Sequence, residues 1–426
     1  MTISNNLYIG ISGLDAHGNA ISVVGDNIAN VSTVGFKASR AGFADVIGGM
    51  AGSSRLGAGV RMDGATTNFA QGTLQQTGSV LDLAVLGRGF FVVQGNHQGI
   101  DSTYYTRDGR FGMDNQGFVV NQEGLRLQGY TINTAGVQST QLGSLDLGAM
   151  QSAPLATANV NMKLNLDSSA VSPGQFLTTD PAGTSNFATS TTVYDSLGNT
   201  HRVDLYFRTD GAGTWDWHAL VDGAELNNGQ PGANEIASGT LTFNTAGALD
   251  VETPAGSSVD FLGATAGQAI NFDFGDAITT DLGTGLAGTT QFAGASVVNA
   301  ITQDGFGAGT LVDVVVDENG TIDGMFSNGQ RRQVARVALA TFAADDQLER
   351  AGNQLFRETT ASGQALVDSA ATGERGSVSS GSIESSNVDL TNELVTLIAF
   401  QRAFQANVKT VQTADEMLNE VANLKR

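Results

Sequence analysis

The residues that most often perform chemistry in proteins are few in this sequence and lie far apart. The chain of 426 residues has 4 histidines and no cysteine. The histidines are His17, His97, His201 and His218, and they form neither an i,i+4 pair nor the H-E-x-x-H motif of a helical zinc site. Without cysteine there is no thiol nucleophile, disulfide framework or iron–sulfur cluster. The sequence therefore predicts no catalytic residue, no metal site and no cofactor, and we expect the protein not to be an enzyme.

A few short motifs match known sites only in part. Residues 273–275 spell the kinase triplet Asp-Phe-Gly, but no glycine-rich phosphate loop or catalytic-loop motif accompanies them. Residues 87–89 lack the third glycine of a dinucleotide fingerprint. The acidic stretches 271–276 and 317–320 could attract Ca²⁺, but neither has the twelve-residue loop that ends in glutamate. We expect both stretches to be solvated turns.

The charge and hydropathy of the chain exclude further classes of function. There are 42 Asp and Glu residues against 21 Lys and Arg residues, a net charge of −21, which opposes binding to nucleic acids and to anionic membranes. The longest apolar stretches, such as 397–400, are far shorter than the ~20 residues of a membrane span. The first residues have neither a basic leader nor an apolar segment, so we expect no cleaved signal peptide.

The composition differs between regions of the chain. The segment 151–305 holds all five prolines, both tryptophans, and 16 acidic against 3 basic residues, a net charge of −13. The last glycine is Gly381, and the 45 residues that follow contain neither glycine nor proline. The two termini and the middle segment therefore differ in composition, and the middle segment is a candidate separate domain.

The C-terminal segment predicts one long helix that starts near Asp389, with Asp389 or Ser386 as the N-cap. Residues spaced by 4 and 3 form a heptad seam, the pattern of a coiled coil. The seam consists of Leu390, Leu394, Leu397, Gln401, Phe404, Val408, Val411, Asp415, Leu418 and Ala422. Its two polar members, Gln401 and Asp415, are expected to set the register of packing at some loss of stability.

The N-terminal segment has the same spacing. Its seam consists of Leu7, Ile11, Leu14, Gly18, Ile21, Gly25 and Ile28. Each glycine costs about 1 kcal/mol of helix propensity, so we expect this helix to form only against a partner that its glycines allow to approach closely. The C-terminal helix is the obvious partner. The alternative is that two unrelated amphipathic helices each cover a domain of their own.

The segment between the helices has the patterns of β-structure. Short apolar or alternating runs occur at 90–93, 118–120, 203–207, 215–220, 311–316 and 334–341. Turn dipeptides separate them, namely Asp108-Gly109, Asn319-Gly320, Asp323-Gly324 and Asn328-Gly329. The pattern is too weak to place strands over 231–300. We predict a multidomain, mainly β protein, whose inner and outer β-domains are inserted between paired terminal helices that form a coiled-coil-like core.

Both ends of the sequence carry extended motifs. Residues 12–43 contain Asn-Ile-Ala-Asn at 27–30 and Thr-Val-Gly-Phe-Lys at 33–37, and further motifs lie at 383–394 and 399–407. The chain resembles bacterial flagellar rod and hook proteins, whose N- and C-terminal signatures match at these positions. The signature residues are Asn27, Asn30, Gly35, Phe36, Lys37, Asn387, Asp389, Gln401 and Arg402.

The middle of the chain distinguishes members of this family. Residues 82–93, 105–111 and 125–130 are similar to segments of both distal rod and hook proteins. The stretch 192–201 and the long insertion around it resemble the outer domain of the hook proteins. A distal rod or other axial subunit is the alternative, and a secreted β-rich adhesin or hydrolase is a more remote one.

The resemblance implies a four-part organisation and a structural function. The parts are a terminal helical core (1–31 with 386–426), an extended connection (32–72 with 366–385), an inner β-domain (73–150 with 306–365) and an outer β-domain (151–305). It further implies a curved, flexible tubular homopolymer that transmits torque from the rod to the filament. The implied partners are the distal rod protein, the hook cap protein, the hook–filament junction protein and the flagellar export apparatus. The implied location is the hook, outside the cell, after export without a cleaved signal peptide.

Overall fold

The computed structural model describes residues 3–51, 54–227, 229–255 and 258–424. The chain divides into two compact units. Unit 1 comprises Met1–Met150, Val312–Met325 and Arg331–Arg426, and unit 2 comprises Gln151–Leu311 and Phe326–Gln330. The four-part organisation is finer than this division and stays a prediction.

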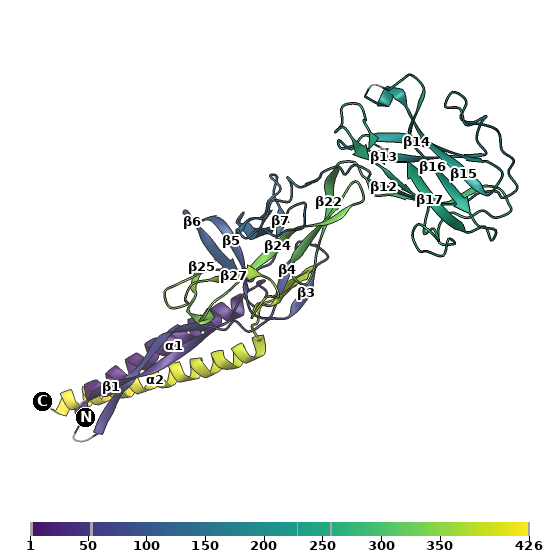
Figure 1. The fold of residues 1–426 in the computed structure, drawn as a ribbon. Coiled ribbons are helices and arrows are strands. Elements are labelled where there is room, and N and C mark those ends of the chain that lie inside the picture. The colour runs from purple at the N-terminus through teal and green to yellow at the C-terminus, as the bar shows by residue number, and fades with distance from the viewer. Residues whose placement is uncertain (1–2, 52–53, 228, 256–257, 425–426) are drawn as a thin grey trace. The chain divides into compact units, whose positions relative to one another are not determined.

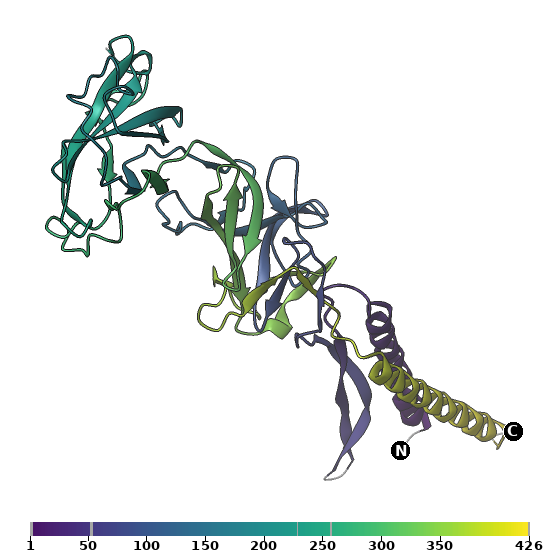
Figure 2. The ribbon, with the colours of Figure 1, turned by 90° about the vertical axis from the view of Figure 1, so that its right-hand side faces the viewer.

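The two helices, α1 (Ile3–Ala29) and α2 (Leu390–Leu424), lie side by side in unit 1 (Figures 1 and 2). They are antiparallel, because Gly10 lies against Val411 at one end of the pair and Asn27 bonds Glu393 at the other. Asp389 is the N-cap of α2, since its carboxylate accepts hydrogen bonds from the backbone N–H groups of Thr391 (2.9 Å) and Asn392 (3.2 Å). The predicted pairing of terminal helices is confirmed. Neither described helix is apolar enough over a sufficient length to cross a membrane.

A long antiparallel hairpin, β1 (Ser39–Ala51) and β2 (Ser54–Thr67), packs along α1. The backbone N–H of Val60 donates to the Ser12 hydroxyl of α1 at 3.2 Å. At Gly59, whose φ is +112°, an added Cβ would lie 2.1 Å from the same hydroxyl oxygen. The hairpin therefore meets α1 by backbone contact that glycine permits.

The rest of unit 1 is built around one large sheet with long and short strands, whose order includes β22-β23-β24-β9-β5-β6-β26-β25. Strands β28 and β4 form a second small sheet, and β29 and β3 a third. The strands are β3 (Leu74–Gln76), β4 (Leu83–Leu86), β5 (Phe90–His97), β6 (Ile100–Thr106), β7 (Gly112–Met113), β8 (Val119–Val120), β9 (Arg126–Thr131), β10 (Gly143–Ser144), β22 (Gly309–Val316), β23 (Thr321–Phe326), β24 (Arg331–Thr341), β25 (Glu349–Gly352), β26 (Leu355–Arg357), β27 (Leu366–Ser369), β28 (Ser377–Ser380) and β29 (Ser382–Glu384), with a short 3₁₀ turn η2 (Asp345–Gln347). Residues of β22 and β23 fall in both units. A cluster of buried aromatic side chains in this part of unit 1 includes Phe90, Tyr105, Phe342 and Phe356.

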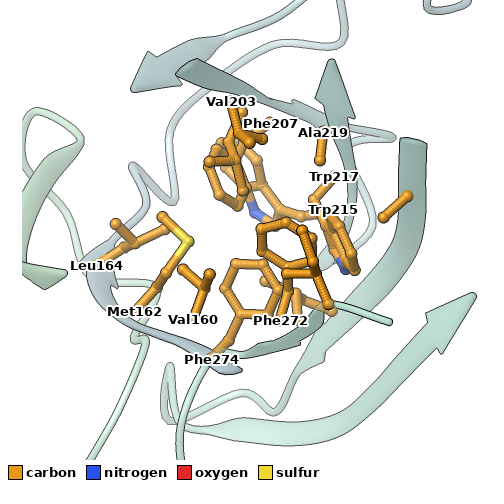
Figure 3. Close-up of a cluster of buried hydrophobic side chains, with 14 of the residues drawn as sticks. Val160, Met162, Leu164, Val203, Phe207, Trp215, Trp217, Ala219, Phe272 and Phe274 are labelled. Atoms are coloured by element: carbon orange, nitrogen blue, oxygen red, sulfur yellow. The ribbon is translucent and has the colours of Figure 1, made fainter. Parts of the chain in front are cut away.

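Unit 2 has a five-stranded antiparallel sheet in the order β13-β14-β15-β16-β17, and a three-stranded sheet in the order β20-β12-β21. Its elements are β11 (Gln151–Ser152), β12 (Asn159–Asn165), β13 (Phe187–Tyr194), β14 (Thr200–Thr209), β15 (Thr214–Asp222), η1 (Gly223–Glu225), β16 (Ala233–Phe243), β17 (Leu249–Ala255), β18 (Ser258–Val259), β19 (Gln268–Ala269), β20 (Asn271–Asp273) and β21 (Val297–Gln303). Both tryptophans, Trp215 and Trp217, are buried in its core beside Phe272 and Phe274 (Figure 3).

The predicted mainly β architecture between two terminal helices is confirmed. Two turn assignments are wrong. The stretch 271–276 is not a solvated turn, because Asn271–Asp273 form β20 and the side chains of Phe272 and Phe274 are buried in the core. Asp323-Gly324 lies inside β23 rather than in a turn. Ile322 pairs with Ala335 and Asp323 with Gln333, so Val334 is the extra residue of a β-bulge on β24, beside the dipeptide.

Candidate functional site

The helix pair meets along a line of small residues on α1. The residues of α1 that are buried are Gly10, Gly13, Ala16, Ala20, Val24 and Asn27. An added Cβ at Gly10 would lie 2.7 Å from Cγ2 of Val411, and one at Gly13 would lie 2.6 Å from Oδ1 of Asn407. A side chain at either position would therefore overlap with the side chain of Val411 or Asn407 as they now lie, and the glycines that weaken α1 allow it to pack closely on α2.

The predicted seam residues lie beside this line rather than on it. The half-buried ones are Leu7, Leu14, Ile21, Ile28, Leu397, Phe404, Val408 and Val411, and the exposed ones are Ile11, Leu390, Leu394 and Leu418. On α1 the centre of the contact runs through small residues, because close approach of two helices requires small side chains between their axes. The large apolar seam residues of α1 flank this line, and α1 also packs against the β1–β2 hairpin.

Two predicted seam residues of α2 do meet α1, since Val411 lies against Gly10 and Phe404 against Gly18. Sequence reasoning missed Phe400 and Asn407, which contact His17 and Gly13 of α1, and the buried Ala414. The ring of Phe400 also contacts His17 of α1 (centroids 5.9 Å apart) and Phe43 of β1 (5.8 Å). The signal that could have located this face is the spacing of Gly10, Gly13 and Ala16, small residues that recur every helical turn.

At the end of the helix pair near Ala29 and Leu390, three signature residues meet two other charged residues in a polar cluster that we call the terminal junction: Asn27, Lys37 and Asn387 with Arg107 and Glu384. Its centre is the ion pair between Nζ of Lys37 and Oε1 of Glu384, which are 2.6 Å apart with both side chains fully buried. Lys37 also donates to the backbone oxygen of Ala70 at 2.9 Å. Burial lowers the pKa of Lys37 and the Arg107 charge lowers it further, while Glu384 opposes both.

The Glu384 carboxylate receives two further contacts, so both of its oxygens have partners. Its Oε2 accepts from Nη1 of Arg107 at 3.3 Å, and its Oε1 accepts from the backbone N–H of Gly72 at 2.7 Å. Arg107 is 3% exposed and also donates to the backbone oxygen of Gly87 at 2.8 Å. Burial lowers the pKa of Arg107, against the attraction of Glu384. Neither Arg107 nor Glu384 was predicted from the sequence.

Two asparagines tie the helix ends to this cluster. Asn27, at the end of α1, exchanges two hydrogen bonds with the backbone of Ser39 (2.7 and 2.8 Å) and donates to Glu393 of α2 at 3.2 Å. Asn387, just before α2, accepts from the N–H of Ala38 at 2.8 Å and donates to the backbone oxygens of Asn68 and Ala70. The side-chain amides therefore hold both termini to the same backbone segments.

The remaining signature residues of the N-terminal motif shape the turn after α1. Gly35 has a φ of +69°, and an added Cβ would lie 2.6 Å from the backbone nitrogen of Asp108, so only glycine fits there. Asn30 bonds Asp26 and accepts from Thr33 at 3.0 Å, which closes the end of α1. Phe36 is buried beneath the Arg350 guanidinium, 5.2 Å from the ring centroid.

The structure brings together the signature residues 27–37, 387 and 389, but not Gln401 and Arg402, which lie further along α2 and are exposed. The described residues include no group of three or more acidic, histidine or cysteine side chains placed to hold a metal ion. The histidines pack against aromatic rings: His201 stacks on Phe261 and His218 on Phe176, each at 3.8 Å between centroids.

Family models match most of the chain. The model of the flagella basal body rod protein matches residues 7–37, and that of the flagellar basal body rod FlgEFG protein C-terminal region matches 379–424. Between them, the flagellar hook protein FlgE/F/G D1 domain matches 84–171 and the flagellar basal body protein FlaE D2 domain matches 165–306. A pair of terminal helices, with these β-domains between them in the sequence, defines a flagellar rod or hook protein.

Full-length relatives decide between the two. The chain is 34% identical to the flagellar hook protein FlgE of Escherichia coli (strain K12), over 97% of this chain and 98% of that protein. It is 33% identical to the FlgE hook protein of Borreliella burgdorferi over 99% of each chain. The chain belongs to the flagellar hook protein family and is a structural subunit of the hook. The solved structure of the Helicobacter pylori hook protein FlgE2 aligns with a TM-score of 0.44 at 14% identity, over 71% of this chain and 98% of that one.

Proposed function

We propose that this chain self-assembles into a curved, bend-tolerant tube that transmits torque from the basal-body rod to the filament, a role that requires no catalysis. The observation that carries the proposal is the construction of unit 1, in which both chain ends form one helix pair fixed to the β-strands by a buried junction. In such a polymer the fixed helix pair of unit 1 would hold neighbouring subunits together. The separately folded unit 2 would leave the polymer able to deform.

The proposed assembly contacts are the predicted seam residues that the single subunit leaves exposed. Ile11, Leu390, Leu394 and Leu418 are large apolar side chains with 38–49% of their surface accessible. Burying such side chains against another subunit is favourable by about 25 cal/mol per Å² of apolar surface. Contacts of this kind between different faces of identical subunits build an open helical polymer rather than a closed ring.

The proposed partners are a distal rod protein, a hook cap protein and a hook–filament junction protein, together with the flagellar export apparatus. Export without a cleaved signal peptide, to the hook outside the cell, fits an N-terminal helix weakened by Gly10, Gly13, Gly18 and Gly25. Such a helix has a small free energy of unfolding, so it can pass through an export channel unfolded, and it becomes stable when it packs on α2.

The proposal is tested by electron microscopy of cells that lack this gene. We expect basal bodies that carry no hook and no filament, and restoration of both by the gene supplied in trans. Curved hooks of normal length in the deletion strain would refute the proposal. Basal bodies whose rod is truncated would instead indicate a distal rod subunit.

A further inference from the structure

Glu384 connects segments that are far apart in the sequence. It lies at the end of β29, 347 residues from Lys37 and 277 residues from Arg107. Its backbone oxygen accepts from the N–H of Gly35 at 2.8 Å, and its carboxylate accepts from the N–H of Gly72 at 2.7 Å. Glu384, a single residue of the C-terminal segment, therefore bonds groups of residues 35–37, of Gly72 and of Arg107, which follows β6.

The two buried cations of this cluster, Lys37 and Arg107, share one carboxylate, that of Glu384. Lys37 and Glu384 are fully buried and Arg107 nearly so. A buried ion whose partner is removed keeps its desolvation penalty and loses the attraction that offset it, which is strongly destabilising. If the N-terminal segment were undocked, Glu384 would lose Lys37, and if the C-terminal segment were undocked, Lys37 and Arg107 would both lose the carboxylate that pairs with them.

Two further hydrogen bonds join the C-terminal segment to N-terminal residues. The N–H of Ala38 donates to the side chain of Asn387 at 2.8 Å, and the N–H of Ser385 donates to the backbone oxygen of Thr73 at 2.8 Å. Both bonds require the C-terminal segment in its docked position, as the ion pairs of Glu384 do.

We propose that Glu384 is the residue that makes docking of the two terminal segments, 33–38 and 382–389, mutually dependent, so that neither is held on the β-strands of unit 1 without the other. Because α1 ends before the first segment and α2 begins after the second, the helix pair closes only in a chain with both segments docked. A subunit with one free end thus offers no finished lattice surface, a consequence that rests on the proposed assembly function.

The test is hydrogen exchange of the full-length protein, followed by mass spectrometry of peptides that cover 33–38, 70–74 and 382–389. Lys37→Met should speed exchange in 382–389, whose sequence is unchanged, by about tenfold or more, because local opening frees its amides. Glu384→Gln should do the same for 33–38 and 70–74. The matched control is Arg331→Met, which removes the cation of the exposed pair with Asp323 in β23 and should leave all three peptides unchanged.

Further variants keep the proposal falsifiable if a charge removal prevents folding. Glu384→Asp keeps the charge but shortens its reach, and should give a smaller loss of protection in the same peptides. The double variant Lys37→Met, Glu384→Gln should lose less protection than the sum of the two single variants. Loss confined to the mutated segment, or strict additivity, would overturn the proposal. These readouts concern the free subunit, so a failure of the wild-type chain to polymerise would refute the assembly function and leave them untouched.

Discussion

Glycines of α1 differ in the space that their surroundings leave for a side chain. Gly13 faces Asn407 so closely that an added Cβ would lie 2.6–2.8 Å from three atoms of that side chain. Gly25 is exposed, and an added Cβ there would meet nothing within 4 Å. The first glycine is required by packing on α2, whereas the second only weakens the isolated helix.

These two positions give a matched pair of substitutions in one helix. Gly13→Ala should lower the free energy of unfolding by about 1–2 kcal/mol, because overpacking at the contact exceeds the gain in helix propensity. Gly25→Ala should raise it by about 0.5–1 kcal/mol through propensity alone. Thermal unfolding followed by far-ultraviolet circular dichroism measures both. Equal effects of the two substitutions would contradict the close-packed contact at Gly13.

Glu252 of β17 is the titratable residue of unit 2 most affected by its surroundings. It lines a cavity of about 470 Å³ together with Asp273, Asp276 and Asp281. Burial, followed by repulsion from Asp273 and Asp281, raises its pKa to about 7, although the N–H of Phe274 opposes the shift. The folded unit therefore holds a proton on Glu252 that the unfolded chain would release above pH 4.5.

This shift predicts how the stability of unit 2 depends on pH. The raised pKa costs nothing below pH 4.5, where Glu252 is protonated in both states, and its cost grows until pH 7. We expect a loss of about 1–2 kcal/mol between pH 5 and 8, after allowing for solvent screening, and Glu252→Gln should abolish most of it. Urea unfolding followed by tryptophan fluorescence reports on this unit, since both tryptophans lie in it. An unchanged pH profile in the variant would contradict the assignment.

At the scale of elements, hairpins in both units share one turn built from the pattern Asp/Asn-x-x-Gly. In each, the first side chain accepts hydrogen bonds from the backbone N–H groups two and four residues later, and the glycine has a positive φ. The turns begin at Asp114, Asn121, Asn133, Asp195, Asn244 and Asp317. The acidic stretch 317–320 is one of them: the Asp317 carboxylate accepts from the N–H groups of Asn319 and Thr321.

The turn at Asn244 between β16 and β17 tests how much this motif contributes to the free energy of unfolding. Asn244→Ala removes acceptors for the N–H groups of Ala246 (2.9 Å) and Ala248 (3.1 Å), and should destabilise unit 2 by about 1–2 kcal/mol. The exposed Thr179 provides the control Thr179→Ala. The tryptophan-monitored urea midpoint should fall for the first variant and stay constant for the second. A midpoint equal to that of the control would show that the side chain is dispensable.

What could be predicted from sequence depends on how local the determining contacts are. Helix α2 was predicted because its spacing and its cap at Asp389 lie within one segment. The strands β16 to β20 are not predicted, because their sequences are rich in Gly, Ala and Thr and lack a clear alternation, and β16 and β20 are also held by pairing with β15 and β12. Lys37 was singled out by the resemblance, but its partner Glu384 was missed, since nothing local in the sequence joins residues 347 positions apart.

At the scale of the whole molecule, charge is concentrated in one unit. The segment 151–305 carries −13 of the net charge of −21, so copies of unit 2 repel one another at low ionic strength. We expect this unit to form the outer, soluble layer of the polymer, and unit 1 with its helix pair to form the lattice.

Removing most of unit 2 tests this layering. Ser152 and Gly309 lie opposite each other in an antiparallel pair, so an Asn-Gly turn can join them after deletion of 153–308. The shortened chain should still polymerise, and at lower protein concentration than the full chain because the repulsion is lost. Electron microscopy and sedimentation measure both. A shortened chain that stays monomeric, with an intact circular dichroism spectrum of its helices, would contradict the layering.

The terminal junction also defines how a load travels through the subunit. Chain leaves α1 at Ala29 and enters α2 at Leu390, and both connections pass through the cluster around Glu384. Tension on either helix therefore reaches the β-strands through that helix's own connection, and the ion pair between Lys37 and Glu384 lets the two connections share it. Without this ion pair each connection would bear the tension of its own helix alone, so we expect failure under repeated loading to begin at the junction.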